Sequence, residues 1–202
     1  MTEEIKLDYE KFKVGNKKEY YGGNQEWYKK YFQRLAGCGP TTASAIIMYE
    51  KRKLKELKYT KSELLNLMEE VWNYITPGNM GVNKVEYFKN GFDKYLKDNN
   101  LTFESSILEI PKSKNKRPTN IELFDYLKSS ITSDHPIAFL NLDHGKEKRL
   151  ESWHWVLIIG ITYDKEEGII NASIADQGEI KTINLTLWLE TTLLGGGFIY
   201  YK

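Results

Sequence analysis

The sequence predicts an α+β fold in which an N-terminal helical part packs on a C-terminal antiparallel sheet. Three observations carry this prediction. Apolar residues recur at helical spacing up to about residue 130, they form short strand-like runs from residue 136 onward, and no strand–helix–strand alternation mixes the two parts. With 202 residues, 41% of them hydrophobic, the chain can bury one substantial core. We therefore expect a single domain over residues 1–202, helical at about 20–130 and a sheet at about 136–202.

The first long helix is predicted to begin at the only cysteine of the chain. Gly37-Cys38-Gly39-Pro40 is typical of a loop that turns into a helix, because proline fits the first helical turn, where its missing N–H costs nothing. Small and then aliphatic residues follow through Met48, as in a buried helix. Cys38 therefore lies at a helix N-terminus, where unpaired N–H groups and the helix dipole stabilise a negatively charged thiolate.

Three further helices are predicted from a capping pattern, in which a potential cap residue is followed three positions later by glutamate. The apolar residues behind each cap recur at helical spacing, so we assign them to the core. The caps are Thr60 with Glu63, Asn83 with Glu86, and Thr119 with Glu122; the apolar sets are Leu64, Leu65, Met68, Val71, Trp72 and Ile75, then Val85, Phe88, Phe92, Tyr95 and Leu96, then Ile121, Phe124 and Leu127.

Short apolar runs predict the strands. An edge strand is expected within residues 101–110, and the main set at residues 137–142, 153–163, 169–174, 180–185 and 198–201. The run at 153–163 is apolar on both alternating faces, which predicts a central strand. Gly195-Gly196-Gly197 is expected to form a turn before the last strand, because no helix follows it as a phosphate-binding loop would require.

Composition excludes several classes of protein. The chain has 29 Lys and Arg against 28 Asp and Glu, so its net charge of +1 favours neither nucleic acid nor an anionic membrane as partner. The start of the chain is polar and acidic, unlike a secretory signal, and no run approaches the ~18 apolar residues of a membrane span. A lone cysteine fits a reducing compartment, so we expect a soluble cytoplasmic protein. Three scattered histidines and one cysteine provide no metal-ligand pair, and we expect neither metal nor cofactor.

His154 is the histidine that stands out. It opens the predicted central strand, where a polar imidazole needs a partner, whereas His135 and His144 fall in loops and are expected to be exposed. Asp176 ends the next strand, and adjacent antiparallel strands would bring its carboxylate close to His154. Together with Cys38 these residues suit thiol catalysis, in which imidazole takes the thiol proton and a carboxylate orients the ring.

The same residues carry a resemblance to a known family. Gly22-Gly23-Asn24-Gln25-Glu26-Trp27, Gly37-Cys38-Gly39-Pro40 before a helix, His154-Trp155-Val156 on a strand, and Asp176 before Gly178 together resemble the papain-like cysteine peptidase superfamily. The most similar branch is the bacterial group related to the bacteriocin-leader-processing (C39-like) peptidases. The resemblance extends from Gly22 to the last strand, and Gly-Cys-Gly-Pro is its most specific part.

The resemblance implies a role for each residue. Cys38 would be the nucleophile, His154 the general base and then acid, and Asp176 the orienting third member. It also implies a glutamine before the cysteine that forms the oxyanion hole with the Cys38 N–H. Gln33 has the more usual spacing to the cysteine, whereas Gln25 lies in the turn-plus-tryptophan setting of this branch, and we favour Gln25.

One departure from papain concerns the third member. If the glycines are matched, the position where papain has asparagine is Ala175 here, and Asp176 follows one place later. Aspartate is usual in the leader-processing branch.

The functional prediction is hydrolysis of a peptide or small amide through a thioester at Cys38. Two alternatives share the fold: an acyltransferase or glutamine deamidase that uses the same site, and a catalytically silent module that binds a peptide. The acceptor of the acyl group, water or amine, separates the hydrolase from the acyltransferase.

Overall fold

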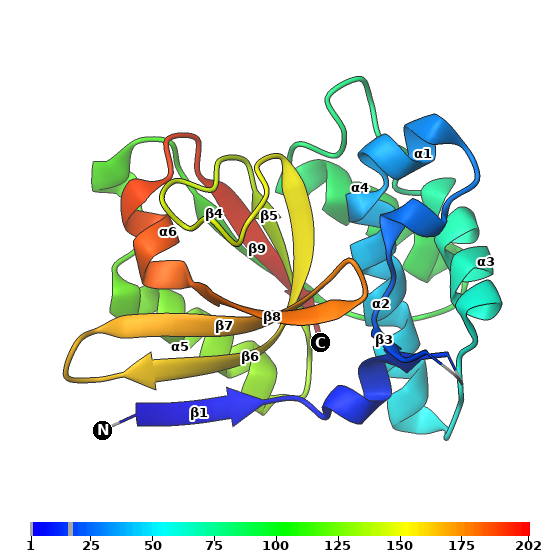
Figure 1. Ribbon diagram of the computed structural model, residues 1–202, viewed down its shortest axis with the longest axis horizontal. Coiled ribbons are helices and arrows are strands. Elements are labelled where there is room, and N and C mark those ends of the chain that lie inside the picture. The colour runs from blue at the N-terminus through cyan, green and yellow to red at the C-terminus, as the bar shows by residue number, and fades with distance from the viewer. Residues whose placement is uncertain (1, 16–17) are drawn as a thin grey trace.

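The computed structural model describes residues 2–15 and 18–202 and has the α+β organisation predicted from sequence, with a sheet beside a helical half (Figure 1). The sheet has seven antiparallel strands in the order β4-β9-β5-β6-β7-β8, with β1 added to β6. Its strands are β1 (Thr2–Lys6), β4 (Ser105–Ile110), β5 (Ile137–Asn141), β6 (His154–Asp164), β7 (Ile169–Asp176), β8 (Glu179–Asn184) and β9 (Gly196–Tyr201). The expected edge strand is β4, and β6 lies inside the sheet as predicted.

The helical half contains α1 (Tyr31–Ala36), α2 (Cys38–Leu54), α3 (Lys61–Trp72) and α4 (Val85–Asp98), whereas α5 (Asn120–Thr132) and α6 (Leu185–Thr191) accompany the sheet (Figure 1). A two-stranded ribbon of β2 (Lys13–Val14) and β3 (Tyr20–Tyr21) and short 3₁₀ turns at Tyr9–Phe12, Gln25–Trp27 and Lys114–Lys116 complete the elements. Within the described part of the chain, no helix has the length and apolar character needed to cross a bilayer.

Two of the three predicted helix caps are confirmed and one is wrong. Thr60 with Glu63 and Thr119 with Glu122 form complete capping boxes at α3 and α5. Asn83 does not cap α4, because the helix begins one residue later than the pattern requires and its N-cap, Lys84, makes no side-chain cap bond. The predicted apolar stripes are largely buried, but Ile121 is exposed in the first turn of α5.

Three sheet features differ from the prediction. β1 was not expected, because most of its residues are polar or charged and only its pairing with β6 identifies it as a strand. The run predicted to end as a strand at residue 185 instead turns into α6, whose first turn is capped by the Asn184 side chain on Leu187 N. Gly196 and Gly197 belong to β9 and not to a turn; a Cβ on Gly196 (φ +153°) would lie 2.0 Å from the Leu140 carbonyl oxygen.

Helix α2 is the central element of the core. It is buried from Cys38 through Tyr49, and it packs on both α3 and β6. Near its start, a loop before α4 closes over it: the Trp155 indole donates from Nε1 to Val82 O at 2.6 Å and stacks on Phe88 with ring centroids 4.4 Å apart. These contacts fix the first turn of α2 against the first residues of β6.

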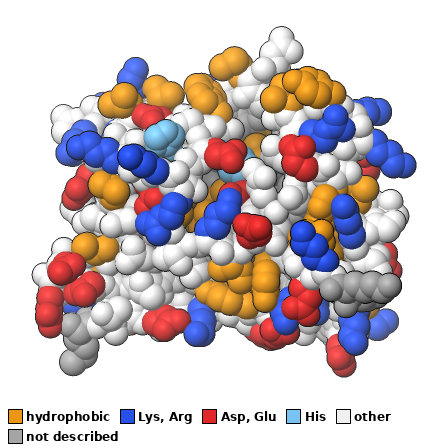
Figure 2. Space-filling view, in the orientation of Figure 1, with side chains coloured by type: hydrophobic (Ala, Val, Ile, Leu, Met, Phe, Trp, Pro, Cys, Tyr) orange, Lys and Arg blue, Asp and Glu red, His pale blue; other side chains and the backbone are white. Residues whose placement is uncertain are grey.

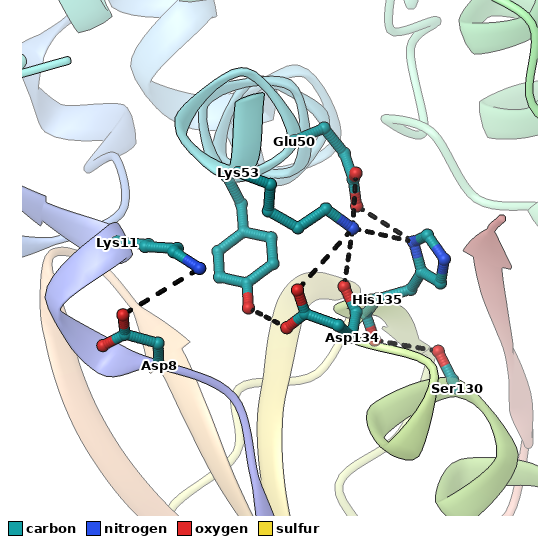
Figure 3. Close-up of polar contacts among 8 residues, drawn as sticks. Asp8, Lys11, Glu50, Lys53, Ser130, Asp134 and His135 are labelled. Atoms are coloured by element: carbon teal, nitrogen blue, oxygen red, sulfur yellow. Dashed lines mark hydrogen bonds and ion pairs between the residues drawn. The ribbon is translucent and has the colours of Figure 1, made fainter. Parts of the chain in front are cut away.

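The other end of α2 is held by a polar cluster (Figure 3). Lys53 Nζ pairs with Glu50 at 2.7 Å and donates to Asp134 O at 2.8 Å, and Glu50 also contacts His135 Nδ1 at 3.0 Å. The prediction that His135 is exposed is therefore wrong, since its side chain is mostly buried between α2 and the turn before β5. Because both ends of α2 are anchored, the position of the helix relative to the sheet is well defined.

Candidate active site

Cys38 is the first residue of α2 and is buried. Its position is set by the tight connection from α1, because a Cβ on Gly37 would lie 2.3 Å from Gln33 O and 2.6 Å from the Tyr28 ring. Only glycine fits there, so the two helices follow each other directly. The thiol therefore lies where the first N–H groups of a 17-residue helix have no partner within the helix.

His154 and Asp176 meet where their strands lie side by side. His154 begins β6 and Asp176 ends the neighbouring strand β7, which pairs with it in antiparallel register. The imidazole Nε2 lies 2.8 Å from Asp176 Oδ1, and both side chains are buried. The closeness expected from the sequence is thus present, and it satisfies the polar ring inside an apolar sheet.

The thiol of Cys38 interacts with the same imidazole. Because Nε2 is bound to Asp176, Nδ1 is the ring nitrogen available to the thiol. Cys38, His154, Asp176 and Gln25 all line one pocket of about 20 Å³, enough for roughly one water molecule. On the face shown in Figure 2, charged side chains of both signs are interspersed and apolar side chains gather over α1.

The electrostatics of the site favour charged forms of His154 and Asp176. Burial alone would lower the pKa of His154, but its bonds to Asp176 and Cys38 outweigh burial and raise that pKa to about 10. Burial would raise the pKa of Asp176, yet the hydrogen bond and charge of His154, followed by those of Lys181, hold it below its usual range. The pair therefore stabilises the imidazolium that forms when the ring takes up a proton.

Lys181 is a contact that sequence reasoning missed. Its Nζ lies 2.8 Å from Asp176 Oδ2, the oxygen that His154 does not use. Lys181 is on β8, and the signal that could have revealed it is its place in the hairpin, two residues beyond the partner of Asp176. One lysine among 29 basic residues carries no such signal until the strands are paired.

The two candidate glutamines lie in different surroundings. Gln25 lines the pocket, and its Nε2 donates to Arg34 O at 2.9 Å, which leaves a second N–H on that nitrogen. Gln33 is buried on α1 and donates to Glu69 Oε2 at 2.6 Å. It is not among the residues that line the pocket. Of the two, Gln25 is the one that the structure brings beside Cys38 and His154.

The segment between β5 and β6 leads to His154, and the buried carboxylate of Glu147 holds this segment in place. This carboxylate, 2% exposed, accepts from Arg149 N, Nε and Nη2 and from Asn184 N at 2.7–3.0 Å. Trp153, directly before His154, has φ +59°, so the backbone turns sharply into β6. His144 is in the same segment and is half-buried, which corrects the expectation that it is exposed.

The described residues contain no group of three or more His, Cys, Asp or Glu that could hold a metal ion. The side chains that line the pocket supply a thiol, an imidazole, a carboxylate and an amide.

Comparison with known proteins identifies the class of fold. The solved structure titled "Crystal structure of UfSP from C.elegans" superposes with a TM-score of 0.59 at 10% sequence identity. The match covers 99% of this chain and 34% of that one, so this chain spans about a third of the length of that protein. The fold, with a cysteine at the start of a central helix and a histidine on the adjoining sheet, is that of the papain-like cysteine peptidases.

The family follows from the sequence. A model described as the Peptidase_C39 like family matches residues 23–192, and the chain belongs to that family. None of the curated proteins compared with the sequence matches it.

Proposed function

We propose that this protein is a cysteine peptidase that hydrolyses a peptide or amide bond through a thioester at Cys38. The observation that supports it most is the convergence of three segments: the buried Asp176–His154 pair and the thiol at the N-terminus of α2 line the same pocket, where the thiol influences the imidazole. A thiol becomes an effective nucleophile only after it loses its proton to a base, and the imidazole of His154 can act as that base.

The proposed reaction has two halves. The thiol proton passes to His154 Nδ1, the thiolate attacks the substrate carbonyl carbon, and the oxyanion is stabilised by the Cys38 N–H and a Gln25 N–H. The imidazolium then gives its proton to the leaving amine, and a thioester remains. In the second half water attacks the thioester with His154 as base, which releases the acid and restores the thiol. Throughout, Asp176 keeps the ring oriented and stabilises its charge.

Alkylation of Cys38 tests the central claim without a known substrate. Iodoacetamide should label the wild-type protein near neutral pH about 100-fold faster than it labels His154→Ala, because only the wild type has a base that ionises the thiol. The measurement is the alkylation rate against pH, with Cys38→Ala as the control for labelling at any other site. Equal rates for the wild type, His154→Ala and a free thiol would favour a silent peptide-binding module instead.

A second prediction concerns Gln25. Gln25→Ala should lower the hydrolysis of p-nitrophenyl acetate about 100-fold, because the tetrahedral intermediate loses one oxyanion donor. Its alkylation by iodoacetamide should be unchanged, since displacement at a saturated carbon forms no oxyanion.

Gln33→Ala is the matched control, because Gln33 also precedes Cys38 in the chain but contacts Glu69 outside the pocket. It should leave hydrolysis within about threefold of the wild type. If Gln33→Ala lost hydrolysis and Gln25→Ala kept it, the assignment of the oxyanion donor would be reversed.

A further inference from the structure

The Asp176 carboxylate has two partners, and only one of them belongs to the proposed catalytic set. Oδ1 contacts His154 and Oδ2 contacts Lys181, each at 2.8 Å. The carboxylate is 4% exposed, whereas the Lys181 side chain is 32% exposed and reaches the pair from the edge of the sheet. Both oxygens of a buried carboxylate are therefore occupied by cationic donors.

The hairpin of β7 and β8 places Lys181 where it can make this contact. Asp176 pairs with Glu179, and Lys181 pairs with Ile174, two residues away along the same face of the hairpin. Lys181 is thus the diagonal neighbour of Asp176, at a separation that a long side chain spans. Because both strands are paired along their length, the lysine has a defined direction of approach.

The cationic groups that act on Asp176 come from two strands. His154 acts from β6 and Lys181 from β8, while Cys38 on α2 acts on His154. Without Lys181, Oδ2 would lose its cationic partner in a buried setting, where a lone carboxylate readily takes up a proton. A protonated Asp176 no longer stabilises the charged ring of His154.

We propose that Lys181 is a positioning residue, which fixes the Asp176 carboxylate against His154 and keeps it ionised as the pH falls. This inference rests on the proposed function, because it concerns how the catalytic histidine is oriented. Lys181 touches no reacting atom, so its effect passes through Asp176 to His154 and from there to the thiol.

The direction in which the pH profile shifts follows from the pKa of Asp176. Asp176 has a lowered pKa, so it stays ionised to lower pH than an ordinary aspartate, and His154 and Lys181 both contribute to this. Removal of Lys181 takes away one contribution, and Asp176 then takes up its proton at higher pH. The acid limb of any rate that needs the His154–Asp176 pair must move to higher pH.

Two readouts in Lys181→Met test this. We expect the acid limb of the iodoacetamide rate profile to move to higher pH, with a loss of about tenfold in acid and much less near neutrality. The ¹³C carboxyl resonance of Asp176, assigned with Asp176→Asn, should titrate at higher pH than in the wild type. Lys181→Arg keeps the charge and should restore both profiles.

Lys165→Met is the matched control, because Lys165 pairs with Glu3 just beyond the opposite end of β6 from His154. It should change neither profile. Identical profiles in Lys181→Met and the wild type would overturn the proposal and leave the proposed function intact. Wild-type alkylation no faster than that of a free thiol would instead overturn the proposed function, and with it the catalytic meaning of Lys181, whatever the carboxyl titration shows.

Discussion

Asp176→Asn is expected to lower the hydrolysis of p-nitrophenyl acetate by about 10³-fold in a protein that remains folded. Lys181 can only donate, so it selects the single oxygen of the new amide and turns the NH₂ group toward His154. That NH₂ needs an acceptor, which forces the ring proton onto Nδ1, the nitrogen that faces the thiol. In this tautomer the imidazole cannot take the thiol proton.

The double variant Asp176→Asn/Lys181→Met separates this explanation from a simple loss of charge. With the lysine gone, the amide is free to turn its oxygen toward His154 Nε2, and we expect about tenfold recovery of the rate. Circular dichroism would establish that each variant is folded. A double variant slower than Asp176→Asn alone would rule out the tautomer as the cause.

Glu147→Ala is expected to lower the free energy of unfolding by about 3 kcal/mol, because it leaves the Asn184 and Arg149 N–H groups without their buried acceptor. Urea unfolding monitored by tryptophan fluorescence measures the change. Glu179→Ala removes an exposed glutamate from β8 and should stay within about 0.5 kcal/mol of the wild type. If both variants lost the same stability, Glu147 would not be the specific anchor of the segment before His154.

The effect of Glu147→Ala should depend on pH. Burial would raise the pKa of Glu147, but hydrogen bonds from Arg149 and the Asn184 backbone outweigh it and lower that pKa. A lowered pKa contributes stability above the pKa of the unfolded chain and loses it as the pH falls. The difference between the wild type and Glu147→Ala should therefore shrink in acid.

Local chemistry made two of the helix starts predictable. The capping boxes at Thr60 and Thr119 lie within four residues, so the sequence contains the whole interaction. The cap expected at Asn83 was wrong because Asn83 and Glu86 fit the same pattern while the helix begins only at Val85, after the loop whose Val82 is held by Trp155. A contact across 73 residues is not visible in a four-residue pattern.

The candidate site was predictable where it depends on strand ends. His154 is polar at the start of an apolar strand and Asp176 is polar at the end of the next, so simple pairing brings them together. Lys181 and Glu147 were missed for the opposite reason, because both are charged residues among many, and only hairpin register or buried backbone donors single them out. Strand β1 was missed because it becomes a strand only by pairing with β6, more than 150 residues away.

The proposed triad joins three segments that are far apart in the chain: the start of α2, the start of β6 and the end of β7. Neither the helical half nor the sheet contains a complete set of groups, since the thiol comes from one and the imidazole and carboxylate from the other. Reactivity of Cys38 is therefore a property of the docked molecule. The one thiol of the chain reports, by how fast it reacts, whether the two halves have come together.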